Sequence, residues 1–181
     1  MNLPNKLTMM RVFLIPFFVF FLLRADALGE YAKWIAFAIF IVACCTDFLD
    51  GKIAREYNLV TNFGKFMDPL ADKLLVVSAL VCFVTLDRIP TWIVLIIIAR
   101  EFIISGFRLV AAEQGNVIAA SWWGKLKTAE TMLMIIFMIP NFEGDVICII
   151  ELVLIYISLA LTVLSLIDYM IKNRRVLGGS R

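Results

Sequence analysis

Four aspartates form two pairs within a short stretch of an otherwise apolar chain. Asp47 and Asp50 are three residues apart, and Asp68 and Asp72 are four apart. On helices, both spacings place the two carboxylates of a pair on the same face. Clustered carboxylates repel one another unless a cation lies between them, and an all-oxygen ligand set suits hard divalent cations such as Mg²⁺ or Mn²⁺. The spacing therefore predicts a metal site. Two ions that share carboxylates can stabilise the attacking and leaving oxygens of a phosphoryl displacement.

Glycines and basic residues lie among these aspartates. Gly51 and Gly64 have no side chain, which lets a ligand or a neighbouring backbone approach closely, and Arg55 can bind a phosphate through two parallel hydrogen bonds. The alternative is that the aspartates only form ion pairs at the edge of a membrane. Two helically spaced pairs with glycines between them favour the functional interpretation, because ionisable groups within apolar segments are usually functional. The basic residues available for simple ion pairs are Lys52, Arg55, Lys65 and Lys73.

The elements that hold these residues are predicted to be membrane-spanning helices. Of the 181 residues, 62% are hydrophobic, and the mean hydropathy is +0.94, whereas a soluble domain is about half apolar. Long continuous apolar runs favour helices over a barrel of alternating strands. The predicted fold is an all-α polytopic membrane protein, a single domain over 1–181. Its six transmembrane helices are expected at about 8–24, 32–54, 68–86, 90–112, 124–140 and 145–171.

The basic residues indicate how these helices are oriented. With the N-terminus inside, all 17 Lys and Arg residues lie at cytoplasmic ends and loops except Arg24, Lys33 and Arg88. Cytoplasmic loops of membrane proteins carry such an excess of basic residues, so both termini are predicted to be cytoplasmic. The four aspartates then lie at the cytoplasmic boundary, and Arg100 and Arg108 lie in the cytoplasmic half of the fourth helix.

Composition disfavours several other functions. The chain has no histidine, and its cysteines show no CxxC spacing, so a zinc site is not expected. A net charge of +2 gives no indication of nucleic-acid binding. A divalent-cation transporter that uses the aspartates as a permeation site is an alternative. Transporters usually have internal repeats or helices broken near the bilayer midplane, and the sequence shows no repeat.

The aspartate stretch resembles the signature of the CDP-alcohol phosphatidyltransferases, D-x2-D-G-x2-A-R-x8-G-x3-D-x3-D. The resemblance implies a six-helix homodimeric enzyme of the bacterial cell membrane with its active site at the cytoplasmic face. It also implies the transfer of a phosphatidyl group from CDP-diacylglycerol to an alcohol, with release of CMP. Every fixed position of the pattern is matched, by Asp47, Asp50, Gly51, Ala54, Arg55, Gly64, Asp68 and Asp72.

The same resemblance implies roles for individual residues. Asp47, Asp50 and Asp68 would hold one Mg²⁺ or Mn²⁺ ion, and Asp47, Asp68 and Asp72 would hold a second. Asp72 would also act as the general base on the acceptor hydroxyl, which requires an approach to about 3 Å. The residues implied to bind CDP-diacylglycerol are Asn5, Thr8, Gly51, Arg55, Thr61 and Gly64.

Three further segments resemble the bacterial family members whose acceptor is sn-glycerol 3-phosphate. They are NLPNKLTMMRVFLIP near the N-terminus, AREFIISGFR at 99–108 and WGKLKT at 123–128. This acceptor is a dianion near neutral pH, so cations must bind it, and Glu101 is expected to orient one of the arginines. The basic residues at the same predicted depth are Arg100, Arg108, Lys125 and Lys127.

Several points stay open at this stage. Lys125 and Lys127 can also be read as membrane anchors, and an acceptor such as inositol phosphate or serine is the alternative within the family. The sequence does not indicate the native metal or the acyl-chain preference. It also leaves open the roles of Glu130, Glu151 and Asp168.

Overall fold

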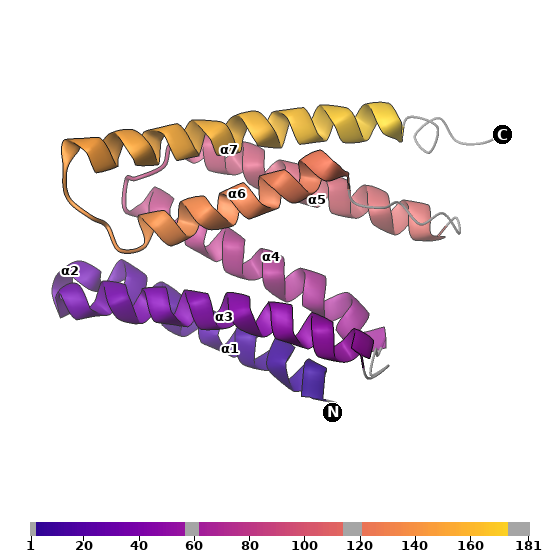
Figure 1. Cartoon of the computed structure of the whole chain (residues 1–181), viewed down its shortest axis with the longest axis horizontal. Coiled ribbons are helices and arrows are strands. Elements are labelled where there is room, and N and C mark those ends of the chain that lie inside the picture. Colours follow the sequence, from indigo (N-terminus) through magenta and orange to yellow (C-terminus); the bar gives the residue numbers. More distant parts are fainter. Residues whose placement is uncertain (1–2, 57–61, 114–120, 174–181) are drawn as a thin grey trace. The chain divides into compact units, whose positions relative to one another are not determined.

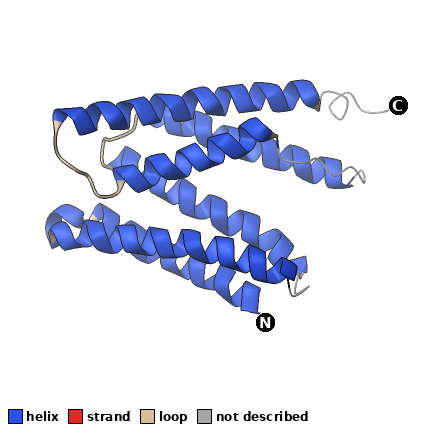
Figure 2. Ribbon diagram, viewed as in Figure 1, coloured by secondary structure: helices blue, strands red, loops and turns tan. Residues whose placement is uncertain are grey.

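The computed structural model describes residues 3–56, 62–113 and 121–173, with side chains except at 3–4, 47–56, 62–63, 65–66 and 112–113. Within these ranges every regular element is a helix and no strand occurs (Figure 2). The all-α class is therefore confirmed. The helices are α1 (Leu3–Leu23), α2 (Ala25–Leu28), α3 (Glu30–Glu56), α4 (Asn62–Thr85), α5 (Thr91–Glu113), α6 (Trp122–Met138) and α7 (Asp145–Lys172).

The long helices lie where the apolar segments predicted them, and one short helix was not predicted. That helix, α2, has four residues and lies between α1 and α3. It is too short to show a hydrophobic period. Gly29 follows it with a φ of 88°, a left-handed conformation that glycine adopts without steric cost. The glycine therefore lets the chain leave α2 and enter α3 within one residue.

Two helices in the described part of the chain are long and apolar enough to cross a bilayer, Asn5–Leu23 within α1 and Asp145–Lys172. Both expose large apolar side chains, such as Phe13 on α1 and Ile149 on α7. Contiguous apolar surface of this kind is unfavourable in water and favourable in lipid. These are the features of a membrane protein. The full set of six spans and the cytoplasmic position of both termini stay predictions.

The chain divides into two compact units. The first comprises Met1–Arg88 with Ile135–Phe142, and the second comprises Ile89–Met134 with Glu143–Arg181. Helix α6 contributes its residues up to Met134 to the second unit and its last turn to the first. The single domain predicted over 1–181 stays a prediction.

In the first unit, α1 packs along α3 and against α4 (Figure 1). On the facing side of α3, Ala36 and Ala43 are buried and small, so the two backbones can approach closely. The rings of Phe18 and Phe40 meet between these helices with their centroids 5.5 Å apart. The buried residues of α1 recur every three or four positions, as one helical face requires: Asn5, Thr8, Arg11, Ile15, Phe18 and Leu22.

In the second unit, α5 packs on α7 (Figure 1). Much of the buried face of α7 consists of small hydroxyl residues, which allow close packing and offer hydrogen-bond partners inside an apolar protein. One of them, Ser158, lies 3.0 Å from the Thr131 hydroxyl of α6. The buried residues of α7 are Ile155, Ser158, Thr162, Ser165 and Tyr169.

Candidate active site

The two aspartate pairs lie on two different helices. Asp47 and Asp50 belong to the C-terminal part of α3, and Asp68 and Asp72 belong to the N-terminal half of α4. The side chains of Asp68 and Asp72 are half-buried, whereas those of Asp47 and Asp50 lie outside the described residues. Each pair therefore lies on a helix, which is the condition under which its spacing puts both carboxylates on one face. The metal site itself stays a prediction.

A buried hydroxyl from α1 contacts one of these carboxylates. Thr8 Oγ1 donates a hydrogen bond of 2.5 Å to Asp68 Oδ1. Thr8 is 0% exposed, so water does not compete for this bond. The contact joins the N-terminal helix to the predicted metal ligand across 60 residues of sequence.

A buried guanidinium from the same helix reaches α3. Arg11 is 0% exposed, and its Nε donates to the carbonyl of Ala43 at 3.2 Å. Thr46 Oγ1 donates to the same carbonyl at 2.8 Å. In a regular helix the carbonyl of Ala43 faces the amide of the residue four positions later, which is Asp47. Arg11 therefore contacts α3 at the turn from which the first aspartate projects.

The other residues predicted to bind CDP-diacylglycerol are placed only in part. Asn5 and Gly64 are buried. Gly51 and Arg55 lie on α3, but nothing beyond their backbone is described, and Thr61 lies outside the described residues. The nucleotide contacts therefore stay predictions.

In the second unit, one carboxylate joins two of the predicted acceptor-binding cations. Glu101 Oε1 accepts from Arg100 Nη1 at 2.9 Å and from Lys127 Nζ at 2.8 Å. Arg100 is buried and the Lys127 side chain is only 2% exposed. Glu101 thus holds a cation of α5 and a cation of α6 on one oxygen atom, as expected of a residue that orients an arginine.

Two further residues define the position of Arg100. Its Nε donates to Ser165 Oγ on α7 at 3.1 Å. A Cβ atom built on Gly124, in the first turn of α6, would lie 3.3 Å from Arg100 Nη2. The same turn is capped by Ser121, whose Oγ accepts from the Gly124 amide at 3.1 Å. The sequence WGK therefore places a residue without a side chain beside the guanidinium.

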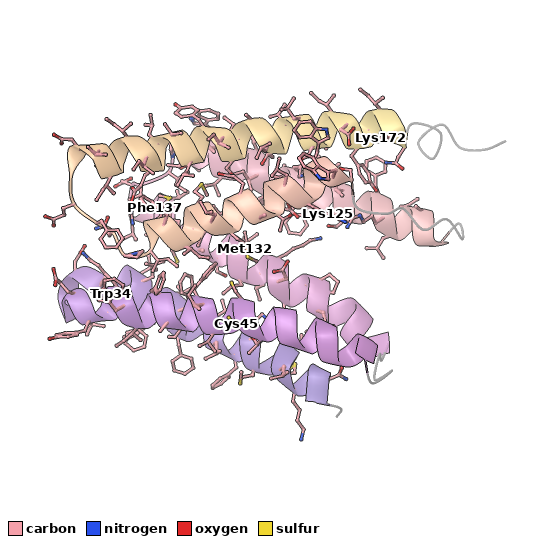
Figure 3. All side chains as sticks on the ribbon, in the orientation of Figure 1. Trp34, Cys45, Lys125, Met132, Phe137 and Lys172 are labelled. Carbon is pink, nitrogen blue, oxygen red and sulfur yellow. The ribbon has the colours of Figure 1, made fainter. Side chains whose placement is uncertain are left out.

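The remaining predicted acceptor residues are exposed. Arg108 lies near the end of α5. Lys125 lies near the start of α6 (Figure 3). Neither shares the Glu101 carboxylate oxygen that Arg100 and Lys127 share. Two of the four basic residues are therefore buried and pair with Glu101, and the other two are exposed.

The three acids whose roles the sequence left open have different surroundings. Asp168 pairs with Lys172 at 2.7 Å, one turn along α7. Glu130 has both carboxylate oxygens shielded from solvent and lies within electrostatic range of Lys127 on the same helix. Glu151 is partly exposed on α7. Glu130 therefore lies close to Lys127 of the Arg100–Glu101–Lys127 group.

Sequence reasoning missed Arg11 and Ser165 as parts of these sites. Arg11 was counted only as a basic residue that indicates topology. The available signal was its position three residues after Thr8 and four before Ile15, which places it on the buried face of α1. Ser165 had no comparable signal, because its partner Arg100 is 65 residues away in the sequence.

Known proteins resemble this chain over nearly its whole length. It is 41% identical to the CDP-diacylglycerol–glycerol-3-phosphate 3-phosphatidyltransferase of Bacillus subtilis (strain 168), over 99% of this chain and 98% of the relative. The enzyme of the same name from Haemophilus influenzae is 42% identical over 93% of this chain and 91% of the relative. A probable phosphatidylglycerophosphate synthase of Mycobacterium tuberculosis is 38% identical over 99% of this chain and 85% of the relative. The model of the CDP-alcohol phosphatidyltransferase family matches residues 1–164. The chain therefore belongs to the CDP-alcohol phosphatidyltransferase family, as its aspartate signature predicted.

Proposed function

We propose that this protein transfers the phosphatidyl group of CDP-diacylglycerol to sn-glycerol 3-phosphate, giving phosphatidylglycerol phosphate and CMP for anionic phospholipid biosynthesis. The observation that carries the proposal is the 41% identity, over 99% of the chain, to a relative named for this reaction. The aspartate signature supports the reaction class, and the segments at 99–108 and 123–128 support the acceptor.

The aspartates are proposed to hold two divalent cations, Mg²⁺ or Mn²⁺. The described part of the donor set fits hard cations, because Asp68 and Asp72 present half-buried carboxylates one turn apart on α4. Bound ions would neutralise the substrate pyrophosphate and stabilise the attacking and leaving oxygens. The proposed ligands are Asp47, Asp50, Asp68 and Asp72.

The protein's own groups are proposed to bind the substrates and move one proton. Asp72 accepts the proton of the acceptor hydroxyl, and that oxygen then bonds to the phosphorus that carries the diacylglycerol group. The bond from this phosphorus to the CMP oxygen breaks, and CMP leaves. Gly51, Arg55 and Thr61 are proposed to line the site of the cytidine diphosphate.

The acceptor phosphate is proposed to be bound by Arg100, Arg108, Lys125 and Lys127. Two of these are already held in place, because Arg100 and Lys127 share the Glu101 carboxylate. A cation that is oriented before the ligand arrives loses less conformational freedom on binding. The exposed Arg108 and Lys125 are available to a soluble dianion.

The whole protein is proposed to be a multi-pass homodimer of the bacterial cell membrane, with six spans, both termini in the cytoplasm and the active site at the cytoplasmic face. This topology suits a reaction between a lipid and a soluble acceptor, since both reach that boundary. The homodimer is proposed from the family resemblance alone.

The proposed reaction is tested with purified protein, CDP-diacylglycerol and a panel of acceptors, with and without Mg²⁺ or Mn²⁺, by measuring CMP. We expect CMP release with glycerol 3-phosphate and a divalent cation, and little with serine or inositol phosphate. Faster release with another alcohol would reassign the acceptor. Ion flux into liposomes without any CMP release would favour the transporter alternative.

The general base is tested by Asp72→Asn. An amide cannot accept the hydroxyl proton, so CMP release should fall by about 10²- to 10⁴-fold, the usual contribution of a general base. The matched control is Asp26→Asn, which makes the same change at an exposed position of α2 and should keep full activity. Normal turnover by Asp72→Asn would exclude the assignment.

A further inference from the structure

We propose that Thr8 is a positioning residue for the metal ligand Asp68 and does not contact the nucleotide. We also propose that α1 holds both aspartate-bearing helices through Thr8 and Arg11. The inference rests on the metal site of the proposed function. It replaces the nucleotide-binding role that family resemblance implies for Thr8.

The burial of Thr8 argues against a direct nucleotide contact. The residue is 0% exposed, so its hydroxyl does not face solvent in this conformation. A threonine hydroxyl also has only one proton to donate, and Thr8 Oγ1 donates it to Asp68 Oδ1 at 2.5 Å. The hydroxyl therefore cannot donate to a substrate phosphate at the same time.

The same hydrogen bond suits a residue that orients a metal ligand. A carboxylate has about four lone-pair sites, so Asp68 can accept from Thr8 and still bind a cation. The hydrogen bond limits rotation of the carboxylate, and buried outer-shell partners of this kind usually affect metal affinity about 10- to 100-fold. Thr8 can thus act on the metal site without touching metal or substrate.

Arg11 connects α1 to α3, the helix that carries Asp47 and Asp50. It lies three residues after Thr8, on the same face of α1, and both residues are fully buried. Its Nε reaches the carbonyl of Ala43 at 3.2 Å, one turn before Asp47 on α3. One face of α1 therefore makes a polar contact to α4 at one metal ligand and to α3 beside another.

The competing interpretation is that the Thr8 hydrogen bond only fastens α1 to α4. Loss of a purely structural bond would lower the unfolding temperature and leave the metal affinity of the folded protein unchanged. Loss of a nucleotide contact would raise the KM for CDP-diacylglycerol at every metal concentration. Loss of a positioning residue would weaken metal binding, and saturating metal would restore the KM.

Three variants separate these outcomes. Thr8→Val keeps the volume and removes the donor, while Thr8→Ser keeps the donor. Thr85→Val is the matched control, because the Thr85 hydroxyl lies at the far end of α4 and donates to the Val81 carbonyl of its own helix at 3.1 Å. Each variant is purified as the full chain, and its thermal unfolding is measured with the same preparation.

The decisive measurement is Mn²⁺ binding without substrate, followed by the electron paramagnetic resonance signal of free Mn²⁺. We expect Thr8→Val to bind about tenfold more weakly, and Thr8→Ser and Thr85→Val to bind like the wild type. We also expect the KM of Thr8→Val for CDP-diacylglycerol to return to the wild-type value at saturating Mn²⁺.

Two results would overturn the inference alone: equal Mn²⁺ affinity of Thr8→Val and the wild type, or a KM that stays raised at saturating Mn²⁺. Absence of Mn²⁺ binding by the wild type would instead overturn the metal site of the proposed function, and the inference with it.

Discussion

The glycine at position 124 leaves room for a charged group. A Cβ at this position would lie 3.3 Å from Arg100 Nη2, which is closer than carbon usually approaches such an atom, and 3.4 Å from Ser121 Oγ, an ordinary van der Waals contact. Arg100 is buried, and its Nη1 and Nε already bond Glu101 and Ser165. The guanidinium can give way to a methyl group only by straining these bonds. A side chain at position 124 is therefore expected to displace the guanidinium by a few tenths of an ångström.

We predict that Gly124→Ala raises the KM for glycerol 3-phosphate several-fold without lowering the unfolding temperature. Alanine favours the helix by about 1 kcal/mol over glycine, which offsets a small local displacement. Steady-state kinetics with each substrate varied in turn, together with thermal unfolding, test this prediction.

Gly106→Ala is the matched control for that variant. Gly106 also lies within a helix, α5, and an added Cβ there meets nothing within 4 Å. Its KM for glycerol 3-phosphate should equal that of the wild type. Equal KM values for Gly124→Ala and Gly106→Ala would mean that the position of Arg100 does not affect the binding of glycerol 3-phosphate.

At the scale of helices, polar contacts join elements that apolar packing alone would leave free to slide. Glu101 of α5 bonds Lys127 of α6, and its neighbour Arg100 bonds Ser165 of α7. Charges are costly inside an apolar protein unless they are paired, so these contacts favour one relative position of the three helices. The same group that is proposed to bind the acceptor therefore also defines the packing of the second unit.

We predict that Glu101→Gln lowers stability and weakens acceptor binding together. Removing one partner of a buried ion pair costs about 3 kcal/mol or more, because the other charge is left uncompensated. The unfolding temperature should fall, and the KM for glycerol 3-phosphate should rise more than that for CDP-diacylglycerol.

The control is Lys172→Gln, which breaks the pair with Asp168 where the lysine side chain is 61% exposed. The Asp168 side chain is 19% exposed, but a pair with one partner largely in water contributes less than a pair with both partners shielded. Stability and both KM values should therefore change less than in Glu101→Gln. A Glu101→Gln protein with wild-type KM for the acceptor would restrict Glu101 to a structural role.

The helices themselves were predictable from the sequence, whereas their contacts were not. The apolar runs are local signals, and the helices lie where those runs occur. The contact of Thr8 with Asp68 spans 60 residues, and that of Lys127 with Glu101 spans 26. Such pairs depend on which faces of two helices meet, which no local period reveals. For this reason Thr8 was assigned to the nucleotide from resemblance, and its burial became evident only in the structure.

At the scale of the whole molecule, the distribution of basic residues predicts the membrane topology. The helices α1 and α7 are each long and apolar enough to cross a bilayer. With both termini inside, only Arg24, Lys33 and Arg88 of the 17 basic residues lie outside. This predicted orientation requires an even number of spans, and it would bring both aspartate pairs to the cytoplasmic boundary.

We predict that cysteines at Lys6 and Lys172 are shielded in intact cells, whereas cysteines at Asp26 and Glu143 react with a membrane-impermeant maleimide. All four positions are exposed in the structure, so reactivity reports the side of the membrane rather than burial. The background is a chain in which Cys44, Cys45, Cys82 and Cys148 are replaced by alanine and which retains activity. Permeabilised cells provide the control, since all four introduced cysteines should then react. Labelling of only one of positions 6 and 172 in intact cells would require an odd number of spans, and would place the termini on opposite sides of the membrane.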